Sequence, residues 1–205
     1  MKINAVISKP SVKINSVNKS AITSAIMIVV GIIVGSIIYL INKDDLVNSL
    51  FDYFISFSMD FSHKNKPEIL SGIILSNIPY FIIMLVLGTS AVGTPGIFAL
   101  TVVKSMGLGM LTTYIYDSFS LKGIEYCLLV TLPGKFILIF AMILATQNSF
   151  ITSDIIRESL ISKEGRVVSL NKFLLRSIFI LFLILLSALV DFIAIVSFSS
   201  LFNFT

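Results

Sequence analysis

Long stretches without charge are the strongest constraint that this sequence places on its fold. Residues 21–41 contain no Asp, Glu, Lys or Arg, and four further runs are largely apolar. About 20 apolar residues make a helix that crosses the hydrocarbon core of a bilayer. The sequence therefore predicts an all-α, polytopic membrane helix bundle that forms a single integral membrane domain. We expect about five transmembrane helices, at 21–41, 69–87, 96–116, 126–146 and 173–198.

The composition excludes the other fold classes. Only 13% of the 205 residues are charged, whereas soluble domains carry roughly 25%. The mean hydropathy is +1.00, which also excludes a disordered chain. The single cysteine, Cys127, cannot form an internal disulfide. A cleavable signal peptide is the competing interpretation of the first run, but this run is longer than a typical signal and lacks a small-residue cleavage site after it, so we expect an uncleaved anchor.

The distribution of charge predicts an orientation. The amino-terminal arm, the linker at 147–172 and the start of the last span carry nine basic and three acidic residues. The opposite side, which includes the segment 42–68, carries four basic and seven acidic residues. Basic loops stay in the cytoplasm, so we expect the amino terminus inside and the carboxyl terminus outside. We expect 42–68 to lie in the outer interface and 147–172 to be a cytoplasmic linker with a short helix at 153–160. The net charge of +4 does not indicate nucleic-acid binding, because the basic residues do not cluster on one water-facing element.

Three charged residues fall inside the expected spans and are candidates for function. They are Lys104, Lys135 and Asp191, and a charge within a membrane is costly enough to be a functional hypothesis by default. The sequence leaves open whether Lys104 and Asp191 form a pair. The step Pro133-Gly134 immediately before Lys135 predicts a broken helix. A break beside a cation marks either a transport site or a packing break within the bundle.

Glycine and proline residues indicate close helix packing and a tight turn. Gly31 and Gly35 form a GxxxG motif, which allows two helix backbones to approach closely. The uncharged run 87–96 contains Gly88, Gly93 and Pro95 and must reverse the chain between the second and third spans. Its simplest interpretation is a hairpin turn packed against other protein.

The sequence contains no arrangement of residues that is typical of a catalytic site. The only histidine, His63, lies in a polar stretch, and we read it as an ordinary exposed residue. We find no metal-ligand set at the usual spacing, no nucleophile with a neighbouring base, and no phosphate-binding or zinc-protease motif. We therefore expect no enzymatic activity, no cofactor and no metal.

The order of the short motifs resembles the stage II sporulation protein M family, from the first span to the end of the last. One departure is that Gly134-Lys135 follow the proline of the fourth span, where the family pattern has a polar His, Gln or Asn. The residues that carry the resemblance are the turn 87–95 ending in Pro95, then Lys104 with Gly107 and Gly109, then Leu132-Pro133, and finally Asp191.

This resemblance implies a multi-pass protein of the bacterial cytoplasmic membrane, in the mother-cell or septal membrane, that serves engulfment of the forespore. It implies a scaffold without catalytic activity. The implied partners are the cell-wall hydrolases of the stage II sporulation D and P type, together with the lipid bilayer and, as a further option, a second copy of the chain. The alternative is a permease-like subunit of a transporter that works with an ATPase.

Overall fold

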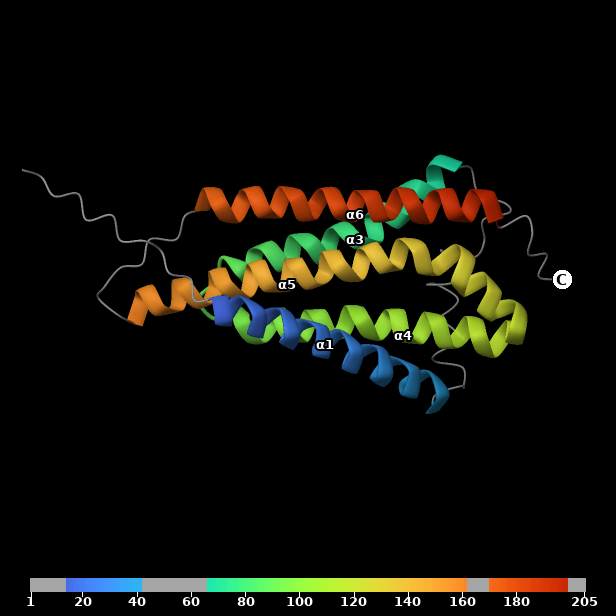
Figure 1. The fold of residues 1–205 in the computed structure, drawn as a ribbon, viewed down its shortest axis with the longest axis horizontal. Helices are drawn as coiled ribbons and strands as arrows, with labels where there is room; N and C mark the ends of the chain where they lie inside the picture. The colour runs from blue at the N-terminus through green and yellow to red at the C-terminus, as the bar shows by residue number, and fades with distance from the viewer. Residues whose placement is uncertain (1–13, 42–65, 162–169, 199–205) are drawn as a thin grey trace, which may run out of the picture.

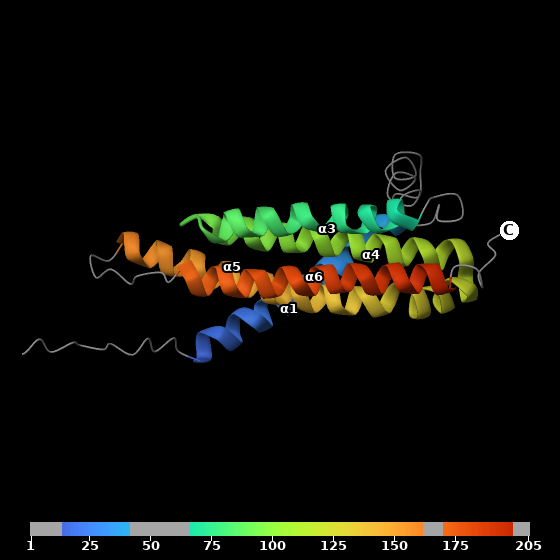
Figure 2. The same ribbon diagram turned by 90° about the horizontal axis from the view of Figure 1, so that it is seen from above.

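The computed structural model describes residues 14–41, 66–161 and 170–198. Most of the expected interfacial segment 42–68, including His63, lies outside these ranges. The described residues form helices that lie side by side along one long axis, while α1 crosses the others obliquely (Figures 1 and 2). The elements in chain order are α1 (Ile14–Ile41), α3 (Lys66–Gly88), α4 (Gly93–Tyr126), the π-helical segment η2 (Cys127–Thr131), α5 (Leu132–Ile161) and α6 (Leu170–Phe198).

The predicted all-α polytopic fold is confirmed. Five helices in the described ranges are long and apolar enough to cross a membrane, and the same ranges contain no strand. The first helix alone has 28 residues and is therefore about 42 Å long at about 1.5 Å per residue. Successive helices run in alternating directions, so that α1 starts at the same end of the bundle as α4 (Figure 1).

A single residue makes the turn between the third and fourth spans. Ser120 has φ 50° and ψ −125°, which is non-helical backbone inside the segment labelled α4. The chain turns back near the yellow-green end of α4 in Figure 1 and continues into α5. The connection between these two spans is therefore a compact helical hairpin.

The expected break at Pro133-Gly134 is instead a local widening of a continuous helix. The five residues of η2 are π-helical, and the N–H of Leu132 donates to the carbonyl of Cys127. Pro133 has no N–H with which to continue the regular pattern, and a π-bulge absorbs this loss without ending the helix. The chain thus passes through Pro133 and Gly134 as α5.

The fourth span, α5, also extends further than the sequence predicted. We expected a linker from residue 147 with a separate short helix at 153–160, but α5 continues without interruption to Ile161. The reason is that the small polar side chains of this extension are buried against other helices instead of facing water. Asn148, Ser149, Thr152 and Ser153 are all less than 9% exposed.

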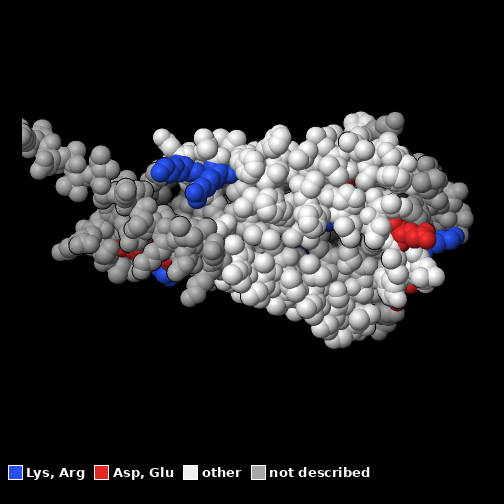
Figure 3. Space-filling model, in the orientation of Figure 1, with Lys and Arg blue, Asp and Glu red and all other residues white. Residues whose placement is uncertain are grey.

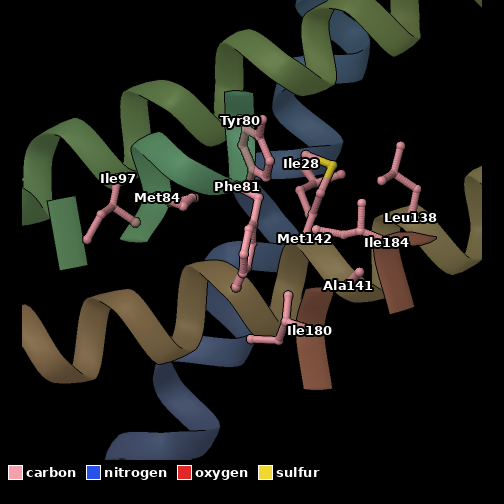
Figure 4. Packing of buried hydrophobic residues seen from close by; sticks show 11 residues of the cluster. Ile28, Tyr80, Phe81, Met84, Ile97, Leu138, Ala141, Met142, Ile180 and Ile184 are labelled. Atoms are coloured by element: carbon pink, nitrogen blue, oxygen red, sulfur yellow. The ribbon is translucent and has the colours of Figure 1, made fainter. Parts of the chain in front are cut away.

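A hydrophobic core joins all five helices near the middle of the bundle (Figure 4). Phe81 and Met84 come from α3, Met142 from α5, and Ile28 and Ile184 from α1 and α6; Met84 lies beside Ile97 of α4 (Figure 4). Large apolar side chains are also exposed on the outside of the helices, as a lipid-facing surface requires. In Figure 3 the middle of the visible face is almost free of charge, and the Lys, Arg, Asp and Glu side chains gather toward its two ends.

Helices α1 and α4 pack through their backbones. A Cβ added to Gly31 would overlap Ser105, one added to Gly35 would overlap the carbonyl of Met106, and one added to Gly109 would overlap the carbonyl of Ile32. The hydroxyl of Ser36 also donates to the carbonyl of Gly109, at 3.4 Å. Lipid tails are as apolar as leucine, so contacts this close contribute much of what holds two membrane helices together.

The other glycines of α4 and of the turn before it differ in their surroundings. A Cβ at Gly93 would overlap the carbonyl of Leu87, so this glycine is needed where the chain reverses. Pro95 follows in the first turn of α4, where a missing N–H costs nothing. In contrast, no atom lies within 4 Å of a Cβ added to Gly107.

The difference between Gly35 on α1 and Gly107 on α4 gives a matched test of the packing between these two helices. Gly35→Ala should lower the free energy of unfolding by about 1–3 kcal/mol, because the methyl group forces the two backbones apart. Gly107→Ala should be neutral or slightly stabilising, since alanine is the better helix former. Thermal unfolding of the two variants in detergent micelles measures the difference, and equal melting temperatures would contradict the backbone packing of α1 on α4.

Candidate functional site: an intramembrane charge cluster

The three charged residues expected inside the membrane occupy two different environments. Lys135 lies 15 residues after the hairpin at Ser120 and 14 before Ser149. At about 1.5 Å per residue these separations are about 22 Å and 21 Å along the chain. Val130, five residues before Lys135, clusters with Ile69 near the start of α3, so Lys135 lies within the apolar part of the bundle but toward the end where α3 begins. Lys104 lies 11 residues after Gly93, or about 17 Å into the bundle by the same rise.

Lys135 and Asp191 form an ion pair between α5 and α6. The ammonium nitrogen Nζ lies 2.9 Å from Oδ2 of the carboxylate, and the two side chains are 26% and 4% exposed. The pairing left open by the sequence is thus settled: Asp191 binds Lys135 and not Lys104. Removing two charges from water is costly, and close contact offsets that cost.

The residue before Lys135 is a glycine, and its missing side chain leaves room for the carboxylate of Asp191. A Cβ on Gly134 would overlap Oδ1 of Asp191, so only glycine allows α6 to approach this closely. Ser187 lies one turn before Asp191 on α6, and its hydroxyl donates to the carbonyl of Gly134 at 2.9 Å. Gly134 and Lys135 therefore act with Ser187 and Asp191 as one interhelical unit, and the π-helical segment η2 sets the angle at which α5 enters it.

The carboxylate of Asp191 depends on its contact with Lys135. Oδ1 of Asp191 is buried and has no hydrogen-bond partner among the described residues. A buried acceptor without a donor is destabilising, so the whole carboxylate depends on the Lys135 ammonium for its compensation.

Lys104 joins α4 to α3 through a different contact. Its Nζ donates to the carbonyl of Ser76 at 2.9 Å. Pro79 lies three residues further along α3, where it removes a helical donor and loosens the turn. A carbonyl has two lone pairs, so the Ser76 oxygen accepts the ammonium at this loosened turn.

A cavity of about 280 Å³ adjoins the ion pair on the side of α1 and α4. Its walls are mainly apolar and include Ile32, Leu108 and Phe136, while Lys135 and Thr131 supply polar atoms. Such a space suits a hydrocarbon chain or an apolar side chain. No group of three or more His, Cys, Asp or Glu in the described ranges is placed to hold a metal ion.

Hydroxyl groups that the sequence analysis did not single out hold the turn between α3 and α4. The hydroxyl of Ser149 donates to the carbonyl of Met84 at 2.9 Å, and that of Ser153 donates to the carbonyl of Ser90 at 2.7 Å. A Cβ on Gly88 would meet Ser149 at 2.9 Å. The spacing of Ser149 and Ser153 by four residues places both on one face of α5, and this is the signal in the sequence that indicates the contact.

Together, the apolar spans, the glycine-mediated packing and the buried ion pair define a polytopic helical membrane protein whose polar groups bind its own helices together. The model of one family, described as Stage II sporulation protein M, matches residues 24–196. The chain belongs to this family. No curated protein and no solved structure gives a significant match.

The ion pair can be tested with a double-mutant cycle. Lys135→Met should cost about 3–5 kcal/mol of stability, because it leaves the buried carboxylate of Asp191 without compensation. The double variant Lys135→Met with Asp191→Leu should recover most of this loss, since it removes both charges together.

The measurement is the free energy of unfolding of each variant in mixed micelles. Lys122→Met, at the hairpin end of the bundle, is the control and should change stability by less than about 0.5 kcal/mol. Strictly additive losses in the double variant would show that the two side chains do not interact.

Proposed function

We propose that this protein is a non-enzymatic membrane scaffold for cell-wall hydrolases of the stage II sporulation D and P type. The role would be to hold these enzymes at the bacterial cytoplasmic membrane, in its mother-cell or septal part, while the septal wall is thinned and the forespore is engulfed. The observation that carries the proposal is membership of the Stage II sporulation protein M family over residues 24–196.

The arrangement of polar groups supports a role in binding. The intramembrane carboxylate is bound to Lys135, and the buried hydroxyls of Ser149, Ser153 and Ser187 donate to carbonyls of neighbouring helices. These contacts stabilise one arrangement of the bundle. A stable bundle whose lipid-facing surface is fixed is well suited to holding partners through their membrane helices.

The charges of the described residues support the orientation that we propose. Lys172 and Arg176 lie where α6 begins, and Glu68, Asp117 and Glu125 lie toward the opposite end. Figure 3 shows a cluster of basic side chains at the end of the molecule where α6 begins, with some acidic atoms below it, and acidic side chains next to a basic one toward the other end. By the positive-inside rule the start of α6 faces the cytoplasm, so the acidic end faces the cell wall on which the hydrolases act.

The test is affinity purification of the tagged protein from sporulating cells, followed by mass spectrometry. Both hydrolases should be enriched well above a control purification with an unrelated tagged polytopic protein. Deletion of the gene should also arrest septal thinning. If neither hydrolase is enriched and thinning proceeds normally, the scaffold proposal is wrong.

The second candidate function is a permease-like subunit that works with an ATPase. The cavity beside Lys135 supports it, because a space between membrane-spanning helices with a few polar groups offers room for a solute. In that case an ATPase would be enriched in place of the hydrolases. Lys104→Leu or Lys135→Leu would then abolish movement of a solute while the protein still assembled.

A further inference from the structure

Among the described residues, Lys104 is a cation within the spans that has no carboxylate partner. Lys104 and Lys135 are the two cations in the apolar part of the described spans, Asp191 is the one carboxylate there, and Asp191 is bound to Lys135. Lys104 makes its one recorded side-chain contact with the carbonyl of Ser76, which satisfies one of its three N–H donors. A net positive charge therefore remains within the membrane beside α3 and α4.

The surface around Lys104 is open to lipid, and the glycine beside it lacks a side chain. Val103, the preceding residue on α4, is 63% exposed, and Leu75 on α3 is 68% exposed. Gly107 lies one turn beyond Lys104, and a Cβ there would have no neighbour within 4 Å. We call this surface of Leu75, Ser76, Val103, Lys104 and Gly107 the Lys104 face. Its glycine leaves room for another backbone to approach the ammonium closely.

Water and lipid headgroups do not relieve this charge. The nearest end of the bundle is about 17 Å away along α4, which is farther than a lysine side chain extends when it snorkels. Headgroup phosphates lie at the interface and not at this depth. An acidic side chain that lies within the membrane would supply a compensating charge at this depth.

We propose that the Lys104 face binds a transmembrane helix of a partner protein that carries an acidic side chain at the depth of Lys104. A second copy of this chain is a poor occupant, because its intramembrane carboxylate, Asp191, is 4% exposed and already paired. The inference rests on the proposed scaffold function for its choice of a protein helix as the occupant. It adds the location of the binding surface and the chemistry that the surface recognises.

The experiment uses the full-length protein in phosphatidylcholine vesicles and a designed leucine–alanine transmembrane peptide. One peptide carries a single Glu at the depth of Lys104, and matched peptides carry Gln or Leu at that position. Energy transfer between labelled protein and labelled peptide measures binding. The Glu peptide should bind about tenfold more tightly than the Leu peptide, the scale of polar contacts between membrane helices.

Variants of the protein then locate the contact. Lys104→Met should reduce binding of the Glu peptide to the level of the Leu peptide, and Lys104→Arg should retain it. Gly107→Leu should weaken binding by filling the space that this glycine leaves while the melting temperature stays unchanged. Phe136→Leu, on α5 and 71% exposed in the native chain, is the control and should bind as the native protein does.

Equal binding of the Glu and Leu peptides to the native protein would overturn the proposal, and this comparison does not depend on any variant folding. Unchanged binding by a folded Lys104→Met protein would overturn it as well. Either result would leave the scaffold function intact, because co-purification of the two hydrolases tests that function separately.

Discussion

The ion pair between Lys135 and Asp191 is the contact on which the rest of this bundle depends. Within the apolar part of the bundle neither charge is well hydrated, so each depends on its contact with the other. Glycine at position 134 makes that contact possible, because any side chain there would occupy the place of Oδ1. The close approach of α6 to α5 at Gly134 accompanies this contact, and the widening of the helix just before it accommodates Pro133.

The remaining helices are joined by contacts of a different kind. Backbone packing at Gly31, Gly35 and Gly109 holds α1 on α4. Hydroxyl groups of Ser149 and Ser153 hold α5 on the turn between α3 and α4. In lipid the hydrophobic effect does not drive helices together, so such small-residue and polar contacts supply the specificity of the fold. Most of the buried polar groups named here bind neighbouring helices in this way, while Oδ1 of Asp191 and the Tyr80 hydroxyl have no partner among the described residues.

The number and class of the helices could be predicted from the sequence, because a long run of apolar residues is stable in lipid mainly as a membrane-spanning helix, which satisfies its own backbone hydrogen bonds. The small-residue spacing of Gly31 and Gly35 also indicated a close helix contact. The partner of Asp191 could not be predicted, since depth along a helix says nothing about which neighbour a side chain faces. The predicted end of the fourth span was wrong for a related reason. In the sequence, Ser149 and Ser153 resemble residues of an aqueous linker, and only the structure shows that they are buried against α3 and the turn that follows it. Gly107 and Gly109 are alike in sequence, yet only Gly109 touches another helix.

The central claim is that this protein acts through the lipid-facing surface of α3 and α4, where it holds a membrane-anchored hydrolase. Site-specific photo-crosslinking in sporulating cells tests it most directly, with the photoreactive residue at position 103 in one strain and at position 136 in another. Both positions are exposed in the isolated bundle. The account predicts a crosslink to one of the two hydrolases from position 103 and none from position 136. Equal crosslinking from both positions, or crosslinks to lipid alone from position 103, would contradict it.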